Sequence, residues 1–109
     1  MKVIYISHPY GGEENNRTAV DKIILKLGET FPDAAYFSPL HALRRPYDFK
    51  NYDRDLDAAI EIMKRCDAVF FTGIWSESTG CREEFETANK LNMRYFCNTQ
   101  SLMKYLKGE

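Results

Sequence analysis

The chain has 109 residues, of which 44% are hydrophobic, 14% aromatic and 28% charged, and its formal net charge is -1. This length and apolar content predict one domain, residues 1–109, built around a single core. The small net charge argues against a protein that coats a nucleic acid polymer or an anionic membrane. No stretch is apolar and long enough for a membrane span, and the start runs straight into a strand pattern, so we expect a cytoplasmic protein.

Alternating patterns of strand and helix occupy the first part of the chain. Residues 2–7 form a short run of β-branched and aromatic residues that stops at the turn formers His8-Pro9-Tyr10-Gly11-Gly12. Apolar residues at helical spacing then predict a helix over about 15–30, capped by Asn15 or Asn16 and ended by Gly28 and Pro32. A second, shorter strand is predicted over 34–38.

The longest irregular segment runs from Pro39 to Lys50 and carries His41, Arg44 and Arg45. Long loops in compact domains are often functional, so this segment is a candidate lid. The alternative is a solvated connector whose arginines pair with nearby acids.

The second half of the chain repeats the alternation. Its predicted elements are a helix over 52–65, a strand over 68–72, a helix that ends near Asn92, a strand over 94–97 and a last helix over 99–106. Strands that alternate with helices predict a parallel sheet with right-handed crossovers. We therefore expect a flavodoxin-like or Rossmann-like three-layer α/β sandwich with a parallel sheet of about four strands.

The three cysteines, Cys66, Cys81 and Cys97, are widely spaced and lie in apolar patterns. Their odd number and spacing favour neither a disulfide framework nor a CxxC metal or redox site. We expect plain buried thiols, because free cysteine is among the most buried residue types.

The helix after the third strand places one of its acids against the domain. At about 100° per residue, Ala88 shares a face with Cys81, whereas Glu83 and Glu86 lie on the opposite side. Glu84 lies roughly 60° from Cys81, beside the apolar stripe. It is also expected in the first helical turn, where backbone N–H groups favour an ionised carboxylate. Such a carboxylate suits a nucleophile in glycosyl chemistry, although one acid can point inward by chance.

Two loops are candidates for ligand contacts. The hydroxyls of Ser76-Glu77-Ser78-Thr79-Gly80 stand at a helix start and can either cradle a phosphate or simply cap the helix. The loop after the first strand would lie across from Glu84 if strands one and three are neighbours. His8 and His41 can act as acid or base, but two isolated histidines do not form a metal site. The sequence contains no P-loop lysine motif, no GxGxxG and no GxSxG.

Several motifs taken together resemble a known family. They are Val3 to Gly12, similar to a YxxGPxxG start, Asn15 with Ala19, Cys66-Asp67-Ala68-Val69, and Trp75 to Ala88, which follow W-x-x-S-x-G-x-x-x-E-x-x-x-A. With these motifs the chain resembles, over most of its length, the nucleoside 2-deoxyribosyltransferase-like superfamily, which includes deoxynucleoside 5′-monophosphate N-glycosidases. The last motif is the most specific.

The resemblance implies roles for individual residues. Glu84 would be the nucleophile, oriented by Tyr5, and Ser78 would bind a 5′-phosphate. The remaining substrate contacts would come from Ser7, His8, Pro9, Gly11, Gly12, Trp75 and Gly80. Arg17, Arg44 or Arg45 could add charge-assisted phosphate contacts.

Two positions depart from the family pattern. His8 stands where the family usually has a glycine that lets backbone approach the ligand. Ala59 occupies the position of a catalytic aspartate, although Asp55 lies one helical turn earlier on the same face and could replace it.

The resemblance implies cleavage or transfer at the N-glycosidic bond of a (deoxy)nucleoside 5′-monophosphate, with no metal or organic cofactor and with sites completed across subunits of a homo-oligomer. Its partner would be a small nucleotide or nucleoside. One alternative is a non-catalytic nucleotide-binding or sensing domain on the same fold. Another is an interaction module that uses exposed Tyr47, Trp75 and Tyr105.

Overall fold

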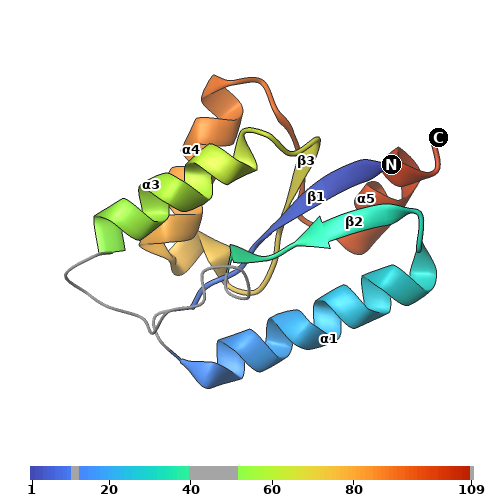
Figure 1. Ribbon diagram of the computed structural model, residues 1–109, viewed down its shortest axis with the longest axis horizontal. Helices are drawn as coiled ribbons and strands as arrows, with labels where there is room; N and C mark the ends of the chain where they lie inside the picture. Colours follow the sequence, from blue (N-terminus) through green and yellow to red (C-terminus); the bar gives the residue numbers. More distant parts are fainter. Residues whose placement is uncertain (11–12, 40–51, 109) are drawn as a thin grey trace.

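The computed structural model describes residues 1–10, 13–39 and 52–108. Strands and helices alternate along this length, as the sequence predicts (Figure 1). The strands are β1 (Lys2–Ser7), β2 (Ala34–Phe37), β3 (Ala68–Phe71) and β4 (Arg94–Phe96). The helices are α1 (Glu14–Thr30), α3 (Tyr52–Met63), α4 (Thr79–Lys90) and α5 (Thr99–Leu106), and a 3₁₀ helix, η2 (Trp75–Glu77), precedes α4.

The four strands form one parallel sheet in the order β2-β1-β3-β4. Tyr5 on β1 lies opposite Phe37 on β2 and Val69 on β3. All strands run in the same direction, so their carboxyl ends meet at one edge. Because β1 and β3 are neighbours, the segments that follow them share that edge, which is where open α/β sheets bind ligands.

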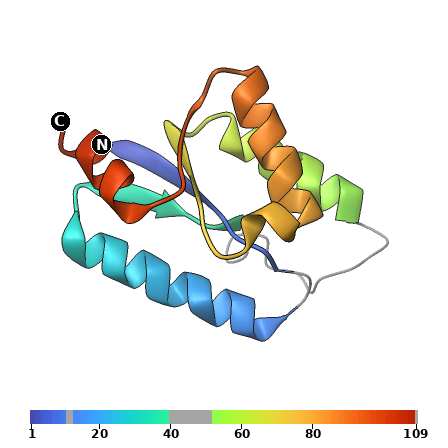
Figure 2. The same cartoon turned by 180° about the vertical axis from the view of Figure 1, so that it is seen from behind.

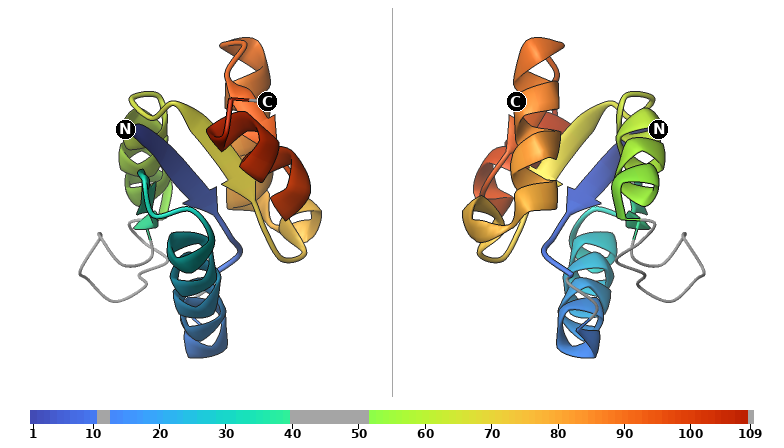
Figure 3. Two further views of the ribbon diagram at one scale, coloured as in Figure 1. Left: turned by 90° about the vertical axis from the view of Figure 1, so that its right-hand side faces the viewer. Right: turned by 90° about the vertical axis from the view of Figure 1, so that its left-hand side faces the viewer.

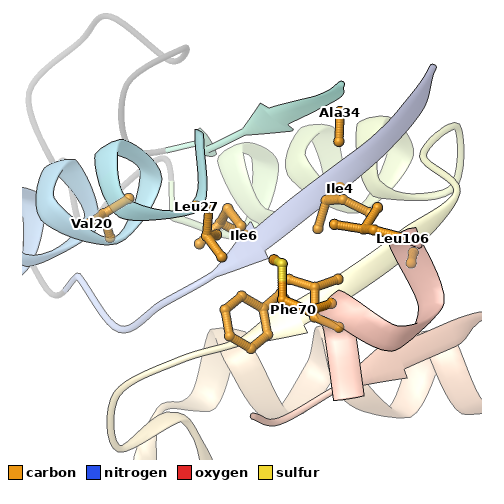
Figure 4. Close-up of a cluster of buried hydrophobic side chains, with 10 residues drawn as sticks. Ile4, Ile6, Val20, Leu27, Ala34, Phe70 and Leu106 are labelled. Atoms are coloured by element: carbon orange, nitrogen blue, oxygen red, sulfur yellow. The ribbon is translucent and has the colours of Figure 1, made fainter. Parts of the chain in front are cut away.

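Alternate side chains of the strands are buried in two hydrophobic cores, one on each face of the sheet. Ile4 and Ile6 pack with residues of α1 and α5, including Leu27 and Leu106 (Figure 4). Tyr5 and Val69 pack on the other face, with residues of α3 and α4. Figures 1 and 2 show α1 on one side of the strands and α3 with α4 on the other, and Figure 3 shows the same separation from the ends of the molecule. The predicted three-layer sandwich is thus confirmed.

Several predicted boundaries differ from the structure by one or two residues. The strands β2, β3 and β4 each end one residue earlier than predicted, and α3 ends at Met63 rather than at 65. The predicted cap of α1 is wrong: the N-cap is Glu13, which makes no side-chain cap. Asn16 instead donates its side-chain amide to the carbonyl oxygen of Tyr10 at 3.0 Å. Gly28 lies inside α1, which continues to Thr30.

The surface differs from prediction at three described residues. Cys81 is buried and Cys66 half-buried, but Cys97 is exposed because β4 stops at Phe96 and Cys97 follows in the turn to α5. Trp75 and Tyr105, which the interaction-module alternative requires to be exposed, are half-buried and pack on aromatic neighbours. Tyr47 lies outside the described residues. Within the described ranges, no helix combines the length and apolar character that a membrane span requires.

Candidate active site

Glu84 on α4 is the central residue of the candidate site. The helix begins at Thr79, because the Ser78 side chain caps it by accepting a hydrogen bond from the backbone N–H of Cys81 at 3.3 Å. Glu84 is only 6% exposed, whereas Glu83 and Glu86 are exposed. The helical spacing therefore identified the inward-facing acid correctly.

The expectation that Glu84 lies in the first turn is wrong. With the helix starting at Thr79, Glu84 falls in the second turn, beyond the free N–H groups that would favour its ionised form. Burial dominates instead and raises the pKa of the Glu84 carboxyl to about 7, while the hydroxyls of Tyr5 and Ser7 act in the opposite direction. Near neutral pH the carboxyl is therefore a mixture of its acid and ionised forms, not a permanently ionised group.

Two β1 side chains lie beside this carboxyl, and both are 0% exposed. The Ser7 hydroxyl donates a hydrogen bond to Glu84 Oε1 at 3.1 Å. Glu84 Oε2 and the Tyr5 hydroxyl are buried, and neither makes a hydrogen bond of acceptable geometry to the described residues. The Tyr5 hydroxyl is nevertheless close enough to interact with the carboxyl, since the pKa of Tyr5 is raised well above its usual value, first by burial and then by Glu84. The structure thus brings Tyr5, Ser7 and Glu84 together, as the sequence predicted.

His8, at the end of β1, is held by residues that follow β3. Its Nδ1 lies 2.8 Å from Thr72 Oγ1, and burial lowers its pKa, so the imidazole is neutral at neutral pH. Gly73 has a φ of 64°, and a Cβ there would lie 2.7 Å from His8 Cε1. Sequence reasoning missed Thr72 and Gly73. The signal available was their position directly after an apolar strand that neighbours β1.

The other predicted site residues are more dispersed. Trp75 packs on Phe71 and Phe85, with both pairs of ring centroids 4.9 Å apart. The Arg17 guanidinium lies 5.4 Å from the centre of the Tyr10 ring, and Arg17 Nε lies 3.6 Å from Glu14 Oε1. Arg17 is thus held along α1 by its own neighbours.

Three more of these residues lie at the same edge of the sheet. Pro9 is half-buried after β1, and Gly80 is the second residue of α4. Asp55 is half-buried near the start of α3, which packs against α4. One turn later, Ala59 is buried against the cluster that contains Tyr5, so a methyl group stands where the family resemblance would place a carboxylate. The predicted residues Gly11, Gly12, His41, Arg44 and Arg45 lie outside the described residues.

A separate pocket of about 430 Å³ opens on the α1 side of the sheet. Its lining comes from α1, from the end of β3 with the segment after it, and from the turn between β4 and α5. It includes Trp75 but not Tyr5, Ser7 or Glu84. Among the described side chains, no group of three or more His, Cys, Asp or Glu residues is placed to hold a metal ion.

Comparison with known proteins identifies the fold. No family model matches the sequence, and no curated protein is a significant match. Among solved structures, the chain is similar to a 2-deoxyribosyltransferase from the psychrotolerant bacterium Bacillus psychrosaccharolyticus, described as a biocatalyst for the synthesis of antiviral and antitumoral nucleosides. The TM-score is 0.64 and the identity 22%, over 85% of this chain and 69% of that chain. The chain therefore has the flavodoxin-like fold of the nucleoside 2-deoxyribosyltransferases, as its motifs predict.

Proposed function

We propose that the protein cleaves or transfers at the N-glycosidic bond of a (deoxy)nucleoside 5′-monophosphate, with Glu84 as the nucleophile. The observation that carries this proposal is the buried Glu84 carboxyl beside the carboxyl edge of the sheet, with one oxygen bound by Ser7 and the other without a hydrogen bond to the described residues. A carboxylate in such surroundings is poorly solvated, which favours attack on an electrophilic carbon.

The reaction would proceed in two steps. Ionised Glu84 attacks C1′ of the sugar while the C1′–N bond breaks, and the base leaves with the bonding electrons and takes up a proton from solvent. Water then attacks C1′, releases the Glu84 carboxylate and the sugar 5-phosphate, and gives its proton to solvent. A second base in place of water would give transfer instead of hydrolysis. Because Glu84 is only 6% exposed, a covering side chain must move before C1′ can reach the oxygen.

The preference for a 5′-phosphate is supported by the start of α4. Ser78 caps this helix, and Ser76 and Thr79 beside it expose their hydroxyl-bearing side chains. Helix N-termini bind anions through backbone N–H groups and the helix dipole. The neutral imidazole of His8 would not supply a positive charge, so the phosphate charge would be met by the helix terminus and arginine.

We further propose that the protein acts in the cytoplasm as a homo-oligomer. The three cysteines are free and Cys97 is exposed, which fits a reducing compartment. Leu91 and Tyr95 expose large apolar side chains beside the edge strand β4, and such residues are compatible with contacts between subunits.

One observation favours a second function, binding of a nucleotide without chemistry. Ala59 is buried against the Tyr5 cluster, so the position expected to hold a catalytic acid holds none. A sensing or binding domain would need only the loops at the sheet edge. In that case Asp55 would not act as a replacement acid.

Incubation with a panel of nucleosides and their 5′-monophosphates, followed by chromatography of the free base, separates these functions. We expect wild-type protein to release base from at least one monophosphate faster than from the matching nucleoside, and we expect Glu84→Ala to release none. Binding of a monophosphate by calorimetry without any base release would favour the sensing function and would contradict the enzymatic one.

A further inference from the structure

We propose that Ser7 is a positioning residue that holds one oxygen of the Glu84 carboxyl and leaves the other as the reacting oxygen, so that Ser7 does not itself contact the substrate. This inference rests on the proposed function of Glu84. It differs from the sequence prediction, which placed Ser7 among the substrate-binding residues.

The burial of Ser7 supports a role through Glu84. Ser7 is 0% exposed at the end of β1, and its hydroxyl already donates to Glu84 Oε1 at 3.1 Å. The single proton of this hydroxyl is already donated to Oε1, so Ser7 has no donor left for a ligand when the side chains that cover the site move. β1 is a central strand, paired on both sides with β2 and β3, so its backbone is among the least mobile parts of the fold.

The neighbours of Ser7 explain why its proton goes to the carboxyl. The Cys81 thiol, 2% exposed, lies near the hydroxyls of both Ser7 and Ser78. Burial raises the pKa of this thiol, so it stays protonated and neutral at neutral pH and can act as a weak donor. The single Ser7 proton is therefore free for Glu84 Oε1, and the hydroxyl keeps lone pairs for the thiol.

The two carboxyl oxygens are consequently not equivalent. Oε1 accepts from Ser7, whereas Oε2 is buried and makes no hydrogen bond of acceptable geometry to the described residues, although the Tyr5 hydroxyl lies close to the carboxyl. The titratable groups close to this carboxyl are Tyr5 on β1 and Cys81 on α4, and α3 adds Asp55 near the same edge. Ser7 is the partner that fixes the rotation of the carboxyl plane, which decides where the reacting oxygen points.

The test compares Ser7→Ala and Ser7→Cys with wild type, using a ¹³C NMR titration of the Glu84 carboxyl together with kcat and KM for base release. A hydroxyl donor favours the ionised form, so in Ser7→Ala the Glu84 midpoint should rise by about one pH unit. At pH 7, kcat should fall by about 10- to 100-fold while KM changes by less than about twofold. Ser7→Cys has a weak S–H donor, so its Glu84 midpoint and its kcat should lie between those of Ser7→Ala and those of the wild type.

The matched control is Thr87→Val, which removes a hydroxyl from the same helix as Glu84; that hydroxyl donates to the carbonyl oxygen of Glu83, so its loss should leave the Glu84 midpoint unchanged. A circular dichroism melt confirms that each variant folds. A raised KM with unchanged kcat would show that Ser7 binds substrate, and an unshifted Glu84 midpoint in Ser7→Ala would show that the hydrogen bond is not formed; either result overturns the inference. If wild-type protein releases no base, the proposed function fails, and the NMR titration alone still decides whether Ser7 holds the carboxyl.

Discussion

Glu84→Gln is expected to lower kcat/KM for base release by at least about 10³-fold. The amide has nearly the shape of the carboxyl but cannot ionise, and its nitrogen and oxygen are poor nucleophiles toward C1′. Removal of a nucleophile leaves only the catalysis that substrate binding provides, which accounts for the size of the loss. The measurement is the initial rate of base release from the best monophosphate of the panel.

Glu83→Gln is the matched control for this loss. Glu83 precedes Glu84 on the same helix and carries the same charge, but its side chain is exposed to solvent. Its substitution should change the rate by less than about twofold. Retention of more than a tenth of the wild-type rate by Glu84→Gln would contradict the assignment of the nucleophile.

The substitution Glu84→Gln is also expected to stabilise the fold at alkaline pH. The pKa of Glu84 is raised from 4.5 to about 7 in the folded protein, so between these values the folded state binds more protons than the unfolded state. The contribution of Glu84 to the free energy of unfolding therefore falls as the pH rises from 4.5 to 7, by up to about 3 kcal/mol. Glu84→Gln lacks this titration, so at pH 8 it should exceed the wild type in Tm by roughly 10 °C.

Urea denaturation at pH 5 and pH 8 measures this effect. The difference in unfolding free energy between Glu84→Gln and wild type should grow from pH 5 to pH 8, because other titrating groups contribute equally to both proteins and cancel. Glu83→Gln should show no such growth, since that side chain is exposed. If the unfolding free energies of Glu84→Gln and wild type changed in parallel with pH, the carboxyl would not be buried as the structure describes.

Burial of Glu84 both lowers the stability of the folded protein and raises the reactivity of the carboxylate. Burial disfavours the charged form, which costs folding free energy that develops as the pH rises from 4.5 to 7, and it also strips the carboxylate of water that would compete with the substrate. A site that stabilised its carboxylate fully would be a weaker nucleophile. Strain or desolvation concentrated at one residue in this way is typical of functional sites.

Local patterns were sufficient to predict the layers of the fold and the orientation of Glu84. The alternation of strand and helix depends on spacing within each segment, and the position of Glu84 beside Cys81 depends only on helical geometry. Ser76, Ser78 and Thr79 are all plausible caps, and with any of them Glu84 lies beyond the first turn; helical spacing fixes the direction of Glu84 but not the residue at which the helix starts. The structure selects Ser78, since η2 occupies the residues directly before it.

Features that depend on distant contacts were not predictable from the sequence. Burial raises the pKa of Glu84, and the Tyr5 and Ser7 hydroxyls that oppose this rise are separated from Glu84 by more than half of the chain. Gly73 leaves room for the His8 ring because it has no Cβ, and the two residues meet only because β1 and β3 are neighbours. The role of Asp55 stays a prediction, because it depends on a substrate and on a proton transfer.

The most direct measurement of the central claim is mass spectrometry of the protein after incubation with a 2′-fluorinated deoxynucleoside 5′-monophosphate. Fluorine next to C1′ destabilises the oxocarbenium-like transition state and slows hydrolysis of a glycosyl ester, which allows the intermediate to accumulate. We predict release of one base per chain and a sugar phosphate attached to the peptide that contains Glu84, with no such adduct in Glu84→Gln. An adduct on any other residue, or base release from the unfluorinated substrate with Glu84 never modified, would contradict the account.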